Sequence, residues 1–139
     1  MFQTVTKLKF LDGYKFNIKF DLENVSNLTV DEPKPTGESR RPNPTRLLSA
    51  AVGHCLSSSL LYSLYKSRVK VKNVETVVTA TAAMNQDGYL RIKDIDVQIR
   101  VEVDEEDKPR LSRCLEIFQN YCTVTESVRK GIQVNVNMT

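Results

Sequence analysis

The sequence predicts a fold that combines antiparallel β-strands with helices and is organised around one long helix. The longest helical pattern covers residues 43–66, NPTRLLSAAVGHCLSSSLLYSLYK. An alternating hairpin pattern precedes it, and two long strand patterns joined by a turn follow it. Helices and strands are told apart by their apolar repeats, about 3.6 residues in a helix and about 2 in a strand.

The first two elements are predicted to form a β-hairpin. Residues 2–11 alternate imperfectly between apolar and polar side chains and lead into Asp12-Gly13, a dipeptide that favours a tight hairpin turn. Residues 14–20 return as the clearest strand pattern in the chain. The side chains expected on the apolar face of this strand are Tyr14, Phe16, Ile18 and Phe20.

A short strand at residues 28–30 is expected next. Residues 31–42 are polar and contain Pro33, Pro35 and Gly37, which disfavour both helix and strand. We therefore expect a surface loop that leads into the long helix.

The long helix has a well-marked start and an apolar body. Asn43 can cap it through its side-chain oxygen, and Pro44 suits the first helical position, where a missing N–H costs nothing. Apolar or small side chains occur on nearly every side, so we expect protein to surround the helix. The polar interruptions, with Gly53 and His54 among them, make it too polar to span a membrane, which takes roughly 20 mostly apolar residues.

Two long antiparallel strands are predicted after the helix. Residues 69–84 are rich in Val and Thr, residues 86–88 (Gln-Asp-Gly) provide a turn, and residues 89–103 return. The acidic residues 104–107 then mark the start of a second helix. That helix is expected to end near Cys122.

Two short elements complete the prediction. Residues 124–129 favour a brief helix that Gly131 ends, and residues 132–138 alternate as a last strand.

Composition narrows the class of protein. A chain of 139 residues fits a single domain, residues 1–139, which can bury about two-thirds of its unfolded surface. The net charge of +3, without a long block of one sign, argues against a nucleic-acid partner. The N-terminus lacks the pattern of a signal peptide, so we expect a cytoplasmic protein that does not bind membranes.

The three cysteines do not form a disulfide framework, and their spacing indicates no zinc site and no cofactor. Cys55 lies in the middle of the long helix, where the helix dipole contributes little to a thiolate. His54 points about a quarter-turn aside, so we interpret it as a packed or capping residue and not as a base for Cys55. Cys114 lies at helical spacing among apolar residues, and we expect it in the core.

Two motifs resemble a known family. PTRLLSAAVGHC is similar to the P-x-E-L-L-x-A-A-L-G-x-C signature of the OsmC/Ohr family, named for osmotically inducible protein C and organic hydroperoxide resistance protein. YCTVTESVRKGIQV is similar to its second signature, a cysteine followed by P-V-S and a short helix. The two motifs occur in the right order, and the resemblance covers essentially the whole chain.

The resemblance implies an α+β fold in which two chains intertwine as a homodimer, with antiparallel sheets wrapped around the long central helix. It also implies a thiol peroxidase that reduces an organic hydroperoxide. Cys55 would attack the peroxide and become a sulfenic acid, Cys122 would resolve it as a disulfide, and a dithiol would regenerate both thiols.

The chain departs from the family at the activating group. Arg46 stands where the first signature has an acid that orients an arginine, and Thr123 replaces the proline after the second cysteine. We expect Arg41 or Arg46 to lower the pKa of Cys55, as nearby cations do at other reactive cysteines. The apolar approach to the thiol is predicted to include Leu48, Val52 and Tyr62.

Two other functions remain open at this stage. A divergent family member could keep the dimer and use its interface pocket to bind an apolar small molecule, with the cysteines merely buried. A redox sensor would use the same sulfenic acid chemistry without turnover.

Overall fold

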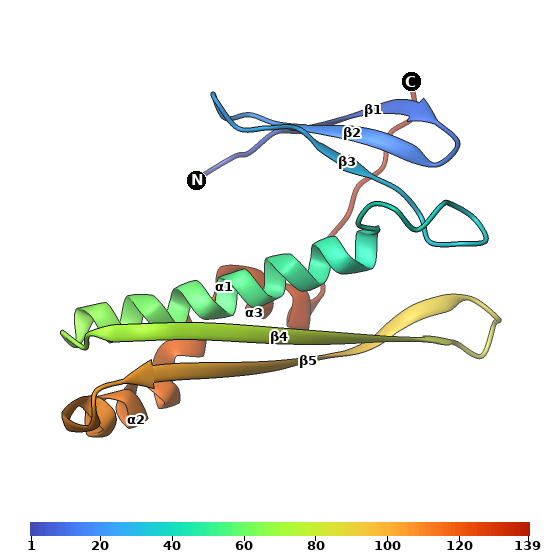
Figure 1. The fold of residues 1–139 in the computed structure, drawn as a ribbon. Coiled ribbons are helices and arrows are strands. Elements are labelled where there is room, and N and C mark those ends of the chain that lie inside the picture. The colour runs from blue at the N-terminus through green and yellow to red at the C-terminus, as the bar shows by residue number, and fades with distance from the viewer. The chain divides into compact units, whose positions relative to one another are not determined.

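The computed structural model describes residues 1–139, which separate into two units, Met1–Leu48 and Ser49–Thr139. Figure 1 shows the chain with its elements labelled. The single domain stays a prediction.

The first unit begins with the predicted antiparallel sheet. Its strands are β1 (Thr6–Asp12), β2 (Lys15–Phe20) and β3 (Leu28–Val30), in the order β1-β2-β3. Gly13 takes a φ of 52°, so the Asp-Gly turn forms as expected. β1 starts later than predicted, because β2 ends at Phe20 and leaves no partner before Thr6.

The loop after β3 is held by one buried carboxylate. Asp31 is 3% exposed, and its two oxygens accept the backbone N–H groups of Glu32 at 2.8 Å and Glu38 at 2.9 Å. The N–H of Asp31 donates to the carbonyl of Pro42 at 3.2 Å. These bonds fold the predicted surface loop back toward the start of the helix.

The long helix α1 (Pro44–Lys66) begins where the sequence predicts. The Asn43 Oδ1 accepts the N–H of Arg46 at 3.2 Å, which is the expected N-cap. Its buried residues are Val52, Gly53, Leu56, Ser59, Leu60, Ser63 and Leu64.

One stripe of α1 is exposed, so the prediction that protein surrounds the helix is wrong for the single chain. The exposed positions follow a helical spacing of three or four and are Ala51, His54, Ser58, Tyr62 and Tyr65.

The prediction that the polar residues of α1 make it too polar to span a membrane also needs correction. By length and a mean hydropathy of 1.3 it is apolar enough to cross a bilayer, so its polar residues do not exclude a span as predicted. The core helix of a soluble protein meets the same criterion, and buried residues make up 39% of the apolar window.

β4 (Val71–Met84) and β5 (Leu90–Val103) form the predicted long hairpin, which runs beside α1 in Figure 1. The turn between them is closed by the Asn85 side chain, which accepts the N–H groups of Asp87 and Tyr89. Gly88 takes a φ of 83° there, a value that favours glycine.

The C-terminal helices follow the prediction closely. A 3₁₀ turn (Glu105–Asp107) leads into α2 (Lys108–Ile117), and a second 3₁₀ turn (Phe118–Tyr121) leads to α3 (Thr123–Lys130). Gly131 ends α3 with a φ of 75°.

The predicted last strand is not formed. Residues 131–139 have neither helical nor strand structure, and the apolar side chains of Ile132, Val134, Val136 and Met138 are 62–91% exposed. A strand needs a neighbour whose backbone groups accept its hydrogen bonds, and no strand of this chain pairs with the segment.

Candidate active site

The structure brings two thiols that are 67 residues apart in sequence into contact. The Sγ atoms of Cys55 and Cys122 lie 2.9 Å apart, and both cysteines are free. Cys55 comes from the middle of α1, and Cys122 is the residue that caps the start of α3. A disulfide bond length is about 2.05 Å, so only a small movement is needed to join them.

The two thiols differ in exposure. Cys55 is half-buried, whereas Cys122 is only 2% exposed. A molecule from solvent therefore reaches Cys55 more easily than Cys122. This asymmetry suits one thiol that meets a substrate and a second that acts behind it.

The N-terminus of α3 approaches Cys55. The backbone N–H of Val124, in the first turn of α3, donates to the Cys55 Sγ at 3.4 Å. The first N–H groups of a helix have no partner inside the helix and carry a partial positive charge, so they stabilise a nearby anion. Cys55 thus gains from α3 the stabilisation that its own mid-helix position lacks.

Polar groups surround Cys122 in the interior. Its Sγ lies 3.0 Å from the Oγ1 of Thr125, which is 6% exposed, and Ser59 of α1 is buried beside it. Burial raises the pKa of the Cys122 thiol, but hydrogen bonds with Cys55, Thr125 and Ser59 lower it by more. The net pKa of Cys122 lies below its ordinary value, which favours a reactive thiolate in the pair.

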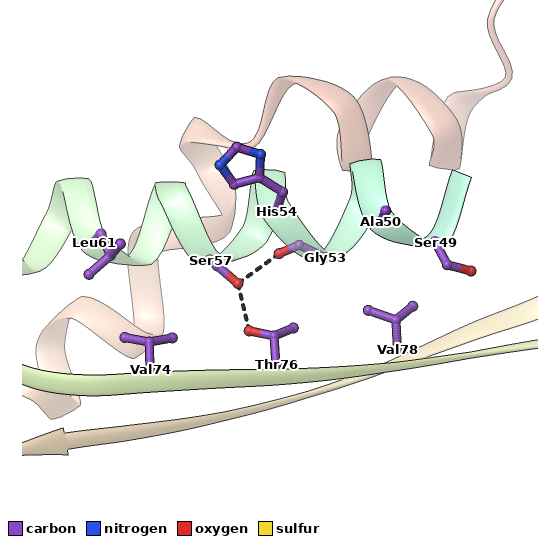
Figure 2. A pocket seen from close by; sticks show the side chains of 9 residues that line it. All are labelled: Ser49, Ala50, Gly53, His54, Ser57, Leu61, Val74, Thr76 and Val78. Carbon is purple, nitrogen blue, oxygen red and sulfur yellow. Dashed lines mark hydrogen bonds between the residues drawn. The ribbon is translucent and has the colours of Figure 1, made fainter. Parts of the chain in front are cut away.

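His54 takes no part in this pair. The prediction was a packed or capping residue, but His54 is exposed in the middle of α1, and it lines a pocket of about 520 Å³ between α1 and β4. Figure 2 shows its ring turned away from the strand, while the Ser57 hydroxyl bridges the carbonyl of Gly53 at 2.7 Å and the Thr76 hydroxyl at 2.6 Å. Ser57 follows Cys55 by two residues, which corresponds to about 200° around the helix axis. The pocket therefore lies on nearly the opposite side of α1 from Cys55.

The predicted arginines belong to the first unit. Arg41 and Arg46 line a hollow of about 350 Å³ at the start of α1, together with Arg40. The guanidinium of Arg46 donates to the Oδ1 of Asn43 at 3.0 Å, so it is directed at the helix start. Arg41 forms no ion pair. The activating role of either arginine stays a prediction.

The three residues predicted to line an apolar approach to Cys55 differ in their exposure to solvent. Val52 is buried and Leu48 is half-buried, whereas Tyr62 is 53% exposed. The Tyr62 ring stacks edge-on against the ring of Tyr121, with centroids 5.3 Å apart. Tyr121 ends the second 3₁₀ turn and directly precedes Cys122, so this aromatic pair connects α1 to the segment that leads into Cys122.

The third cysteine lies apart from the pair. Cys114 is 2% exposed, as predicted for a core residue, and its Sγ lies 3.5 Å from the Ser67 hydroxyl. No group of three or more His, Cys, Asp or Glu side chains is arranged to hold a metal ion.

Sequence reasoning missed three contributors to the site, namely Thr125, Tyr121 and the backbone N–H of Val124. Thr125 follows Cys122 by three residues, a spacing at which the side chain of a capping residue meets the third residue of its helix. For Tyr121, the sequence indicates no role apart from its position next to Cys122. The N–H of Val124 could not be found from side-chain types, because every residue except proline has this group.

Comparisons with known proteins agree on one family. The family model for OsmC-like protein matches residues 36–137. No curated protein matches the chain in sequence.

Solved structures share the fold at low identity. An OsmC-like protein of unknown function from Vibrio cholerae has a TM-score of 0.78 at 14% identity, over 91% of this chain and 94% of that chain. An organic hydroperoxide resistance protein from Elizabethkingia anophelis has a TM-score of 0.67 at 16% identity, over 96% and 92%. The organic hydroperoxide resistance protein OhrB of Bacillus subtilis has a TM-score of 0.61 at 17% identity, over 92% and 91%.

The family match spans most of the chain, from the loop before α1 to the C-terminal segment. The solved structures share the α+β arrangement of antiparallel sheets and helices that this chain has. From this match and this fold we conclude that the chain belongs to the OsmC-like protein family.

Proposed function

We propose that this protein is a thiol-dependent peroxidase that reduces organic hydroperoxides with Cys55 and Cys122. The observation that carries the proposal is the 2.9 Å separation of the two Sγ atoms. Cys55 is the more exposed of the two thiols and is therefore the one that a substrate meets first. Two of the structures that share the fold are organic hydroperoxide resistance proteins, which supports the same substrate class.

The first step takes place at Cys55. Its thiolate attacks the terminal oxygen of the hydroperoxide, the O–O bond breaks, and the alkoxide leaves and takes up a proton to become an alcohol. The sulfur is oxidised to a sulfenic acid, and the peroxide is reduced. The N–H of Val124 supports the thiolate before the attack.

The second step joins the two sulfurs. Cys122 attacks the sulfenic sulfur, the S–S bond forms, and the hydroxyl group leaves as water with the proton from Cys122. A dithiol reductant then reduces the disulfide by thiol–disulfide exchange and restores both thiols.

Arg41 is the arginine that we propose as an additional activator, with Arg46 as the alternative. Arg41 forms no ion pair, whereas the guanidinium of Arg46 is bound to Asn43. A guanidinium beside Cys55 would lower the pKa of the thiol through its charge and its N–H donors.

We also propose an apolar approach for the substrate. Tyr62 of α1 and Tyr121, which directly precedes Cys122, present an exposed aromatic pair beside the two thiol-bearing segments. Leu48 and Val52 precede Cys55 on the same side of α1 and would extend this approach. Such walls favour a bulky apolar hydroperoxide over hydrogen peroxide, because burial of apolar surface stabilises the complex.

The working form that we propose is a cytoplasmic homodimer. The exposed stripe of α1, with Tyr62 and Tyr65, and the exposed apolar side chains of residues 132–138 leave apolar surface for a second copy to cover.

The test follows peroxide consumption by the reduced protein with cumene hydroperoxide and a dithiol. We expect turnover in the wild type, none in Cys55→Ser, and in Cys122→Ser a single oxidation without disulfide formation. Cys114→Ser is the matched control, because Cys114 lies outside the pair, and it should retain turnover.

Mass spectrometry of the oxidised protein decides among the functions. A bond between Cys55 and Cys122 together with turnover supports the peroxidase. The same bond without turnover would favour a redox sensor. If the wild type neither consumes peroxide nor forms the bond, the peroxidase proposal is wrong and a binding role is favoured.

A further inference from the structure

We infer that the hollow at the start of α1 binds a phosphate group through the guanidinium groups of Arg40, Arg41 and Arg46. The hollow has a volume of about 350 Å³, and all the residues that line it belong to the first unit, Met1–Leu48. This inference goes beyond the proposed peroxidase, and it requires neither of the two thiols.

The three guanidinium groups of the hollow have no acidic partner. None of the ion pairs of the chain includes Arg40, Arg41 or Arg46, and the Arg46 guanidinium donates to the neutral amide of Asn43. Residues 39–46 contain three positive side chains and no negative one. An anion from solution would supply the partner that these arginines lack.

The carboxylates of the preceding loop are engaged elsewhere. Both oxygens of the buried Asp31 accept backbone N–H groups of the loop. Glu38 lines a neighbouring hollow with Arg40 and Arg41, but its carboxylate pairs with Lys15 at 3.1 Å and with neither arginine. These two acids therefore compete little with an incoming anion.

The loop that carries two of the arginines is fixed before any ligand binds. Shortly before them, the N–H of Lys34 donates to the Ser39 Oγ at 2.7 Å. Directly after them, the carbonyl of Pro42 accepts the N–H of Asp31 at 3.2 Å. A Cβ atom on Gly37 would lie 2.5 Å from the Asp31 Oδ1, so the loop closes in this way because residue 37 has no side chain. Donors that are already in place cost less to order when a ligand binds.

The number and kind of donors indicate the class of anion. A guanidinium presents five N–H donors in a planar fork that matches the oxygens of phosphates and carboxylates. A carboxylate has two oxygens to share among three such groups, whereas the phosphate of a monoester has three free oxygens and a charge close to −2. Phosphate therefore suits three arginines better than a carboxylate does.

The surroundings of the arginines also suit a phosphate group. The first turn of α1 contains no acidic residue, and the start of a helix carries a partial positive charge that favours an anion. A volume of about 350 Å³ lies within the range of small-molecule sites, and Pro33 and Pro42 add apolar surface to the hollow. The hollow thus has room for a small organic group attached to the phosphate.

The test measures binding to the full chain by isothermal titration calorimetry, at a pH above the second pKa of a phosphate monoester, about 6. The probes are phenyl phosphate, inorganic phosphate and benzoate. We expect saturable binding of one phenyl phosphate per chain, at least about tenfold tighter than that of benzoate. Tighter binding of phenyl phosphate than of inorganic phosphate would assign a phosphorylated small molecule, and the reverse order would assign the free ion.

Arg46→Glu tests the contribution of the arginines. It reverses one charge in the hollow and should raise the Kd for phenyl phosphate at least tenfold, by about the energy of a hydrogen bond to a charged group or more. The helix should persist, because an acid in the first turn of a helix is favourable. Lys34→Ala is the matched control, since it removes a positive charge of the same loop outside the hollow, and its Kd should stay within about twofold of the wild type.

Gly37→Ala separates a built site from a general attraction to positive charge. It leaves the net charge at +3, but its Cβ forces the loop away from Asp31. We expect it to raise the Kd about tenfold, because the donors are no longer held in place. Far-UV circular dichroism establishes that each variant keeps its helices and strands.

Three results would overturn the inference: binding that does not saturate, benzoate that binds as tightly as phenyl phosphate, or equal weakening in Arg46→Glu and Lys34→Ala. A wild-type Kd in folded Gly37→Ala would show that charge alone attracts the anion, and it would also overturn the inference. None of these results bears on the proposed peroxidase, because the titrations contain no peroxide. Arg41 is also the proposed activator of Cys55, so the peroxidase assays use a buffer without phosphate.

Discussion

At the scale of single residues, Cys55 shows how a second helix can place an N–H donor against a thiol in the middle of a first helix. The free N–H groups of α1 lie at its own start, so they do not reach residue 55. The N–H of Val124 comes from α3, which begins directly beside the Cys55 Sγ. In the proposed mechanism, activation of Cys55 therefore does not depend on an arginine alone.

The two candidate arginines differ in their freedom to act, and this leads to a prediction. Arg46 is bound to Asn43, whereas Arg41 forms no ion pair. We expect Arg41→Ala to lower kcat/KM for cumene hydroperoxide about tenfold, because it removes a positive charge that would stabilise the Cys55 thiolate, and Arg46→Ala to lower it by less than about threefold.

The control is Arg40→Ala, a neighbouring residue of the same hollow. Steady-state kinetics across a pH range distinguishes lost activation from lost binding. The ranking is refuted if Arg46→Ala has the larger effect, or if neither variant shifts the pH at which activity rises.

At the scale of elements, the packing of α1 against β4 depends on a glycine. A Cβ atom on Gly53 would lie 2.7 Å from the Cγ2 of Val78, which is closer than side chains pack. The absence of a side chain at residue 53 lets the helix approach the strand, and the bond from Ser57 to Thr76 forms at the same place. Figure 2 shows these contacts on one wall.

Replacing this glycine gives a prediction for stability. Gly53→Ala adds helix propensity of about 1 kcal/mol, but overpacking in an interior costs about 1 to 3 kcal/mol. We expect a net loss in the free energy of unfolding, measured by urea denaturation. Val78→Ala in the same chain removes the clash and should recover most of the loss.

The elements themselves could largely be predicted from the sequence. Asn43 and Pro44 mark the start of α1, Asp12-Gly13 marks a turn, and Gly131 marks the end of α3, because each of these features depends on the backbone preferences of one or two residues. The last strand could not be predicted in this way, since a strand also depends on a partner that local sequence does not specify.

At the scale of the whole molecule, the exposed apolar side chains indicate what a second copy would cover. Residues 132–138 alternate like a strand, and Val134 is 79% exposed. We expect Val134→Lys to weaken the proposed homodimer by at least tenfold in Kd, because it places a charge on the apolar face of this segment.

The control for this prediction is Gln133→Lys, which places the same charge on the opposite face. Light scattering coupled to size-exclusion chromatography measures the mass of each variant across a range of concentrations. Equal dissociation of both variants, or a wild type that is a monomer throughout, would contradict the prediction.

The sequence by itself determined the order of the helices and strands that form, the start of α1, the turns of both hairpins, and the two motifs that contain Cys55 and Cys122. Local preferences and apolar repeats are encoded within a few residues, so they can be recognised without a structure. The family resemblance, which the match over residues 36–137 confirms, follows from the same local patterns.

Only the tertiary structure decided what surrounds the thiols. It placed Cys122 within 2.9 Å of Cys55, set the Val124 N–H against the Cys55 Sγ, and buried Thr125 beside Cys122. These contacts join residues from two helices that are separated by a long hairpin and a third helix. Their geometry depends on how those elements pack, and packing is a property of the folded chain that no local pattern contains.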